Sequence, residues 1–358
     1  MPMEQQKLRV GIIGAGFWTG LIHIPALQAS KNAEIVAISR RNSELLEKIK
    51  NGTGVQSAYT DWREMIENEQ LDAVIVATTH ASHAEPTIAA LKKGIHVLVE
   101  KPIASTSKDA WAMAAAQRES GKILMVSYQS RYHPVYQTVK RALDAGTIGT
   151  VRQVQATCSQ NIGAFLSATP QEELEELMKG LGQPEWFKNA GIVPGDWRSN
   201  PEEMGGGMFA DTGSHFTDLA LWFAGSQAKT VIAFSEPPEN PQEAYLSVQI
   251  RMTNGTLISL SSNTITPGNM FAAKNNFRIL GDLGTLSCDG ERILVERVRD
   301  REDLPVEGQI VTSVQAFLSA ILDGGINLTP ADEAARVVEV TEAAYISVKE
   351  GRTVQLRN

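Results

Sequence analysis

The sequence has little cysteine and no long apolar segment. Its two cysteines, Cys158 and Cys288, lie far apart, so neither a disulfide framework nor a C-x-x-C zinc site is indicated. The longest apolar runs, such as residues 73–77, are far too short to span a bilayer. The first residues lack the charged and apolar regions of a secretion signal. We therefore expect a cytoplasmic protein that does not bind membranes.

Clustered basic residues are also missing. The chain has 33 Lys and Arg against 41 Asp and Glu, a formal net charge of −8 at pH 7. Because phosphate contacts need clustered positive charge, we expect no nucleic-acid partner. Hydrophobic residues make up 42% and charged residues 21%, the ordinary composition of a folded globular protein. Single cores stop growing at about 250–300 residues, so this chain of 358 residues should form two domains.

The first third of the chain alternates strand and helix patterns. Apolar runs of strand length lie at residues 8–13, 34–39, 72–78, 95–99 and 122–127. Helical patterns lie at residues 18–29, 42–50, 83–93 and 106–120. The apolar runs are continuous rather than alternating, which is typical of parallel strands covered on both faces. This pattern predicts a doubly wound α/β domain, a Rossmann fold, over residues 1–127.

The pattern changes after about residue 150. Apolar and polar residues alternate with a period of two at residues 151–160, 245–252, 256–262 and 276–280. Helical patterns lie at residues 170–179, 211–224, 309–323 and 330–349, and a loop rich in Gly, Pro and Trp at residues 180–207. Alternation indicates strands with one solvated face. We expect a second, α+β domain over residues 128–358, with a large, mainly antiparallel open sheet built as a meander.

A glycine loop follows the first strand. Residues 11–19 read G-I-I-G-A-G-F-W-T. In a G-x-G-x-x-G loop the glycines permit a tight turn, close approach of the backbone to a pyrophosphate, and close helix packing. Thr19 replaces the third glycine here, although another glycine follows it. The helix N-terminus offers free N–H groups to the pyrophosphate. We therefore expect a dinucleotide site that includes Gly14, Gly16, Phe17 and Trp18.

The residues after the second strand indicate which dinucleotide is preferred. NAD enzymes usually place Asp or Glu there, on the ribose 2′-hydroxyl. This chain has Ser39, Arg40 and Arg41, and no carboxylate before Glu44. A hydroxyl and guanidinium groups suit a 2′-phosphate, although two solvated loop arginines are the alternative. We predict NADP(H) as the preferred cofactor and NAD(H) as the second choice.

Three blocks in order carry a resemblance to a known family. The glycine loop is the first, and residues 94–102, G-I-H-V-L-V-E-K-P, are the second. The third is G-G-G-M-F-A-D-T-G-S-H-F-T-D at residues 205–218, and residues 127–134 support them. Over nearly its whole length the chain resembles the glucose–fructose oxidoreductase and inositol dehydrogenase family, Gfo/Idh/MocA.

Lys101, Asp211 and His215 are the candidate catalytic residues. Lys101 follows a buried strand, at the edge where open α/β sheets bind ligands, and can stabilise negative charge on a reacting oxygen. Asp211 and His215 are four residues apart, which puts both on one face of a helix. A histidine of near-neutral pKa can take a hydroxyl proton on oxidation and return it on reduction, while Asp211 can contact the hydroxyl or Lys101. The resemblance implies the same roles, and the glycines at 205–207 should allow close approach of a ligand.

The resemblance also implies cofactor contacts beyond the glycine loop. The family usually has T-P-N-x-x-H where this chain has T-T-H-A-S-H. Thr78 and His83 match, whereas His80 departs from the pattern and leaves the nicotinamide-ribose contact open. Glu100 and Lys101 complete the expected cofactor site.

Five residues are expected to face the substrate, and no metal is expected. The substrate residues are Tyr128, Gln129, Asn161, Trp197 and Arg198. An aromatic face such as that of Trp197 can stack on a sugar ring, although a core tryptophan is as good an interpretation. No His, Cys and Asp cluster has metal-ligand spacing, so we predict no metal site.

Together these features predict an NAD(P)-dependent oxidoreductase that moves a hydride between NADP(H) and a carbinol or ketone of a sugar or cyclic polyol. Two alternatives stay open: redox-assisted elimination or hydrolysis of a sugar with a retained cofactor, and a non-catalytic NADP-binding sensor. Unlike sensors, this chain keeps the lysine and the histidine. The resemblance implies a homodimer or homotetramer through the open sheet. The sequence does not choose the sugar, its phosphorylation or the cellular direction.

Overall fold

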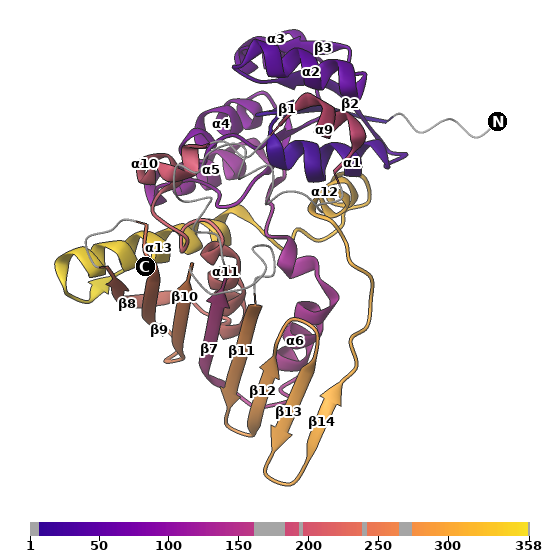
Figure 1. Ribbon diagram of the computed structural model, residues 1–358. Coiled ribbons are helices and arrows are strands. Elements are labelled where there is room, and N and C mark those ends of the chain that lie inside the picture. Colours follow the sequence, from indigo (N-terminus) through magenta and orange to yellow (C-terminus); the bar gives the residue numbers. More distant parts are fainter. Residues whose placement is uncertain (1–6, 161–182, 193–195, 238–241, 265–273, 357–358) are drawn as a thin grey trace.

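The computed structural model describes residues 7–160, 183–192, 196–237, 242–264 and 274–356, which form two sheets with their helices (Figure 1). The predicted helix at 170–179 and the predicted substrate residue Asn161 lie outside the described residues. No helix in the described part of the chain is long and apolar enough to cross a membrane. The same residues contain no group of three His, Cys, Asp or Glu side chains arranged to hold a metal.

The N-terminal sheet has six parallel strands in the order β3-β2-β1-β4-β5-β6. Their bounds are β1 Leu8–Ile13, β2 Ala33–Ser39, β3 Ser57–Tyr59, β4 Ala73–Val76, β5 His96–Val99 and β6 Leu124–Val126. The doubly wound prediction is confirmed. Of the six strands, β3 alone was not predicted, because its three half-buried residues form no apolar run. The strand order reverses between β1 and β4, and ligands of open α/β sheets bind beyond the carboxyl ends of the strands at such a point.

Helices connect these strands. They are the π-helix η1 Thr19–His23, α1 Ile24–Gln28, α2 Ser43–Thr53, α3 Trp62–Asn68, the 3₁₀ helix η2 His80–Ser82, α4 Ala84–Lys92 and α5 Ser107–Ser120. Pro25 has no N–H to offer the carbonyl of Leu21, which fits the change of helix type inside the predicted helix 18–29. Helix α2 begins where the Asn42 side chain accepts from the N–H of Leu45.

The second sheet has nine strands in the order β14-β13-β12-β11-β7-β10-β9-β8-β15. Their bounds are β7 Val151–Ser159, β8 Ala228–Glu236, β9 Tyr245–Met252, β10 Leu257–Asn263, β11 Lys274–Gly281, β12 Gly284–Cys288, β13 Ile293–Arg297, β14 Arg301–Leu304 and β15 Val354–Gln355. The mainly antiparallel sheet is confirmed, but the simple meander is wrong. Strand β7 precedes all the other strands of this sheet in sequence but inserts between β10 and β11, pairing with β10 in parallel and with β11 antiparallel.

The helices of the second region are η3 Gln129–Tyr132, α6 Pro134–Asp144, α9 Glu185–Ala190, η4 Asp196–Ser199, α10 Pro201–Met204, α11 Gly213–Ala224, α12 Ser313–Leu322 and α13 Ala331–Glu350. Helix α11 begins two residues later than predicted, so Asp211 precedes it. The predicted loop at 180–207 carries three short helices in its described part. Strand β9 alternates between exposed and buried residues, as expected for a sheet with one open face.

Segments from the second region also pack on the first sheet. Helix α13 contacts α5 on one side and β8 on the other, and α9 packs against α2 (Figure 1). Phe187 of α9 and Phe317 of α12 are buried in the core of the N-terminal sheet. The part of the chain beyond residue 127 therefore completes the first core, and the boundary at 127 stays a prediction.

Candidate active site

A cavity of about 630 Å³ lies along the carboxyl edge of the N-terminal sheet. Every residue that the sequence assigns to the cofactor lines it: Gly14, Gly16, Phe17, Trp18, Ser39, Arg40, Arg41, Thr78, His83, Glu100 and Lys101. Trp197 and Arg198 line it too, from the segment that follows α9. The volume is in the usual range for a cofactor or drug-sized ligand. The fold thus brings the candidate cofactor residues together around one space.

The glycine loop fits a dinucleotide. Gly14 has a positive φ of 86°, and a Cβ there would lie 2.6 Å from the carbonyl oxygen of Ala77. The N–H groups of Gly14 and Ala15 donate to the carbonyl of Ser39 at 2.9 and 3.0 Å. Thr19, in place of a third glycine, accepts from the N–H of Gly16 at 2.6 Å. The loop therefore keeps a tight backbone open to the cavity, as a pyrophosphate requires.

The two arginines after β2 lie in different environments. The Arg40 guanidinium donates to the carbonyl of Ala15 at 2.8 Å, and burial lowers its pKa. Arg41 is exposed at the cavity. Arg63 lines the same end and stacks on Trp62, with its guanidinium carbon 4.4 Å from the ring centroid. Sequence reasoning missed Arg63, although it lies just beyond β3 at the same sheet edge.

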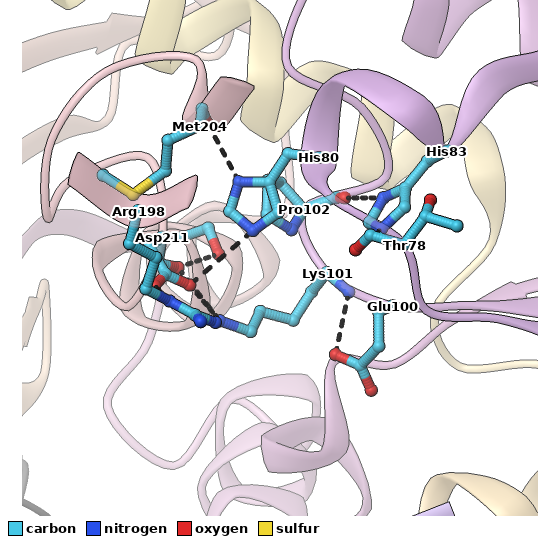
Figure 2. Close-up of polar contacts among 10 residues, drawn as sticks. Thr78, His80, His83, Glu100, Lys101, Pro102, Arg198, Met204 and Asp211 are labelled. Carbon is cyan, nitrogen blue, oxygen red and sulfur yellow. Dashed lines mark hydrogen bonds and ion pairs between the residues drawn. The ribbon is translucent and has the colours of Figure 1, made fainter. Parts of the chain in front are cut away.

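Lys101, Asp211 and Arg198 form a charged cluster at the other end (Figure 2). Lys101 Nζ lies 2.6 Å from Asp211 Oδ1, and Arg198 Nε donates to Oδ2 at 2.8 Å. Each carboxylate oxygen thus receives one cation. Burial alone would raise the pKa of Asp211, but Lys101 and Arg198 hold it well below the usual range. Asp211 is therefore ionised at all ordinary pH values.

His80, which departs from the family pattern, belongs to this cluster. It is buried, its Nδ1 lies 2.9 Å from the carbonyl oxygen of Met204, and its Nε2 lies 3.8 Å from Asp211 Oδ1 (Figure 2). Its ring packs edge-on against Trp197 at 4.7 Å. Burial lowers its pKa to about 3, so the neutral imidazole donates from Nδ1 to Met204. In the sequence, the signal for His80 was that it departs from the family pattern T-P-N-x-x-H.

Glu100 and His83 brace the turn that carries Lys101. Glu100 Oε1 lies 2.7 Å from His23 Nε2, and its other oxygen accepts from the N–H of Lys101 at 3.2 Å. His83 places its two ring nitrogens 3.0 Å from the carbonyl oxygen of Pro102 and 3.3 Å from that of Thr78. The peptide before Pro102 is cis, which the sequence left open.

His215 lies in the first turn of α11, four residues after Asp211. Its ring packs edge-on against the buried Tyr128 at 5.7 Å, and its Nδ1 has no hydrogen-bond partner among the described residues. Burial, with help from the charge of Lys101, lowers its pKa to about 3. This pKa lies well below the near-neutral value that the sequence suggested. Gln129 is exposed, and the cavity lining does not include it.

Comparison with known proteins agrees with this arrangement. Residues 8–128 match the oxidoreductase family with an NAD-binding Rossmann fold, and residues 136–287 match the GFO/IDH/MocA C-terminal domain. The chain belongs to the Gfo/Idh/MocA oxidoreductase family. The resemblance seen in the sequence is confirmed.

Relatives in this family span nearly the whole chain. D-apiose dehydrogenase of Paraburkholderia graminis is 26% identical, with 99% of this chain and 91% of the relative covered. D-xylose 1-dehydrogenase (NADP(+)) 2 of Haloferax volcanii is 23% identical, covering 97% and 99%. The WlbA dehydrogenase of Bordetella pertussis, solved with NADH and UDP-GlcNAcA, has a TM-score of 0.79 at 24% identity, covering 99% and 100%. This structural likeness shows the fold. Because the relatives are named as dehydrogenases, the chain is an NAD(P)-dependent oxidoreductase.

Proposed function

We propose that this enzyme transfers a hydride between a nicotinamide dinucleotide and a carbinol carbon of a sugar or cyclic polyol. The observation that carries the proposal is the cluster of Lys101, Asp211 and Arg198 at the end of the cavity that holds the glycine loop. Relatives named for D-apiose and D-xylose support a sugar substrate. When bound, the nicotinamide ring supplies the group that accepts or gives the hydride.

Lys101 has the charge and position to hold the reacting oxygen. An ammonium group has three donors, and two of them face Asp211, one to Oδ1 at 2.6 Å and one to its carbonyl oxygen at 3.4 Å. A donor left for the substrate would stabilise the negative charge that grows on the oxygen as the carbon–hydrogen bond breaks. Asp211, held from the other side by Arg198, fixes the direction of the lysine.

His215 is suited to exchange the hydroxyl proton. Because its imidazole is neutral, His215 can accept a proton when the alcohol is oxidised; its Nδ1 is enclosed by the protein, so we assign this exchange to Nε2. In the reverse direction the imidazolium returns that proton to the forming hydroxyl. A proton on His215 would lie near the charge of Lys101, which favours its rapid return. Lys101, Asp211 and His215 therefore divide oxygen binding, lysine positioning and proton exchange among them.

NADP(H) is the cofactor that we propose over NAD(H). The exposed Arg41 and the nearby Arg63 line the end of the cavity where a 2′-phosphate would lie, together with Ser39. Arg40 is turned toward Ala15, so Arg41 is the better of the two predicted arginines for that phosphate. The ratio of kcat/KM for the two cofactors tests this preference, and a clear preference for NADH would contradict it.

The function is tested by cofactor titration followed by a substrate panel. Fluorescence titration with NADPH and NADH first measures the two dissociation constants. Keto-sugars, inososes and anhydrosugars are then added to the tighter complex, and oxidation of the cofactor is followed by absorbance. Turnover of one sugar supports the proposal. Release of an altered sugar without net cofactor oxidation would favour the retained-cofactor alternative, and tight binding without turnover would favour a sensor.

The assembly and location expected from the sequence stay predictions. The open face of the second sheet exposes alternate side chains such as Tyr245 and Phe234, at 50% and 69% of their full area. A homodimer or homotetramer through this face would cover them. Light scattering of the purified protein measures the assembly, and a monomer at micromolar concentration would contradict it.

A further inference from the structure

Glu243 is a buried carboxyl group outside the cluster described above. It lies just before β9 and is 1% exposed. Its Oε1 accepts from the N–H of Phe209 at 2.6 Å, and its Oε2 accepts from the hydroxyl of Tyr345 at 3.1 Å. Phe209 belongs to the stretch that follows the three glycines, and Tyr345 belongs to α13. The carboxyl group therefore connects the second sheet, the last long helix and the glycine stretch.

The hydrogen bonds of Tyr345 show which group its hydroxyl donates to. The Tyr345 oxygen accepts from the N–H of Gly207 at 2.9 Å. Its hydroxyl hydrogen goes to Glu243 Oε2. Glu243 therefore accepts from Phe209 on one oxygen and from Tyr345 on the other.

The glycine run fits against these two side chains. Gly206 has a positive φ of 138°, and a Cβ there would collide with the Tyr345 ring. A Cβ on Gly207 would collide with Glu243, and one on Gly205 would lie 2.6 Å from the carbonyl oxygen of Ser105. The sequence suggested that these glycines admit a ligand. The structure instead shows protein groups against all three.

Both ends of the stretch reach the charged cluster. Met204, just before the glycines, accepts from His80 through its carbonyl, and Asp211, four residues after Gly207, binds Lys101 and Arg198. We propose that Glu243 and Tyr345 are positioning residues, which hold residues 205–211 so that Asp211 meets Lys101. The consequence for turnover rests on the proposed function, whereas the structural part does not.

The pH acts on the same network through Glu243. Burial raises the pKa of Glu243 to about 7. Tyr345 from α13 is the titratable group that faces it, and the glycine stretch offers it the N–H of Phe209. Because the pKa is higher in the buried network than in water, opening the stretch is easier when Glu243 is a carboxylate than when it is protonated. The hold on the stretch should therefore weaken as the pH rises through about 7.

The test compares Glu243→Gln and Tyr345→Phe with Glu339→Gln, a control on the same helix as Tyr345. Glu339 is a partly buried carboxyl group whose pKa is also raised, but it is influenced by Arg336 and Glu342 instead. Hydrogen exchange by mass spectrometry is measured on peptides covering 205–211, and kcat is measured from pH 6 to 9 in the full-length enzyme.

Glu243→Gln should speed exchange in 205–211 at least about tenfold and lower kcat about tenfold, with cofactor affinity within about twofold of wild type. The wild-type kcat profile should have an alkaline limb near pH 7, where the hold on the stretch weakens. Glu243→Gln should lack it, and Tyr345→Phe should move it to higher pH because Glu243 loses a donor. Glu339→Gln should leave both measurements unchanged.

Unchanged exchange in both variants would overturn the proposal, whatever the activity. Faster exchange with a wild-type kcat and pH profile would also overturn it, since the hold would then be structural only. Absence of turnover in the wild-type protein would count against the proposed function, and the exchange rates would still decide whether Glu243 and Tyr345 hold the stretch.

Discussion

The dinucleotide end and the reaction end of the cavity differ in where their residues come from. The dinucleotide end draws mainly on the glycine loop, the residues after β2 and Arg63, with Thr78 and His83 from the next strand connection. Its glycine loop is held by backbone hydrogen bonds, in which the N–H groups of Gly14 and Ala15 donate to the carbonyl of Ser39. Neighbouring strands and a turn are sufficient to build it.

The reaction end is assembled from distant segments and depends on side-chain charge. Lys101 follows β5, Arg198 follows α9, and Asp211 precedes α11. Glu243 and Tyr345, still further along the chain, bind the stretch that leads to Asp211. Substitutions at the two ends should therefore have different effects. Those at the dinucleotide end should alter cofactor binding, and those at the reaction end should alter turnover.

Removing the charge of Lys101 should give the largest separation. Lys101→Met should lower kcat about a thousandfold, because the growing negative charge on the substrate oxygen loses its donor. The dissociation constant of the cofactor should stay within about twofold. Steady-state kinetics and fluorescence titration measure the two quantities. Lys93→Met, at an exposed surface ion pair, is the control, and equal loss of cofactor affinity in Lys101→Met would remove the distinction between the ends.

Replacing His215 should have the next largest effect. His215→Asn should lower kcat about a hundredfold, because the hydroxyl proton loses its acceptor in oxidation. Cofactor affinity should again be nearly unchanged, because His215 is not among the residues expected to contact the dinucleotide. Wild-type turnover in this variant would show that another group exchanges the proton.

A substitution in the glycine loop should instead weaken cofactor binding. Gly14→Ala places a Cβ 2.6 Å from the carbonyl oxygen of Ala77 at a positive φ, which should weaken both cofactors roughly tenfold to a hundredfold. Gly54→Ala is a matched control, since Gly54 also has a positive φ of 74° but no atom within 4 Å of the new Cβ. Calorimetric titration distinguishes them, and similar affinities in both variants would contradict the role of the loop.

Arg41 should separate the two cofactors from each other. Arg41→Ala should weaken NADPH about tenfold and leave NADH unchanged, because one charge-assisted contact to the 2′-phosphate is lost. Arg352→Ala, at an exposed arginine near the C-terminus, is the control. An equal effect on both cofactors would show that Arg41 does not contact the 2′-phosphate.

The smallest expected effect concerns stability and comes from Glu243. Its pKa is about 7 in the folded protein and near 4.5 when unfolded, so the folded state binds the proton more tightly. Stability from this group is present below about pH 4.5 and is lost as the pH rises toward 7. The difference in Tm between wild type and Glu243→Gln should therefore become less favourable to wild type from pH 5 to 8. A difference that is constant with pH would contradict the raised pKa.

Much of the first domain could be predicted because its signals are local. The glycine loop, the apolar runs and the residues after β2 each occupy a few adjacent positions, and the strands are close in sequence to the helices that cover them. The residues predicted for the cofactor do line one cavity, although their binding roles stay predictions. Strand β3 could not be predicted from the sequence, because its half-buried residues form no apolar run.

The reaction end was harder because its partners are far apart in sequence. Lys101 and Asp211 were predicted from motifs, but nothing in the sequence places Arg198 on the second oxygen of Asp211 or His80 beside the first. The pKa of His215 follows from burial, which only the folded structure reveals. Glu243 lies in a loop without a motif, and its partners are 34 and 102 positions away.

Deuterium transfer tests the central claim most directly. A sugar that turns over is prepared with deuterium on its carbinol carbon and incubated with the oxidised cofactor and either wild-type enzyme or Lys101→Met. Wild type should place the deuterium on the reduced nicotinamide ring, which mass spectrometry detects, and Lys101→Met should do so about a thousandfold more slowly. Reduced cofactor without deuterium, or equal transfer by both proteins, would contradict the central claim.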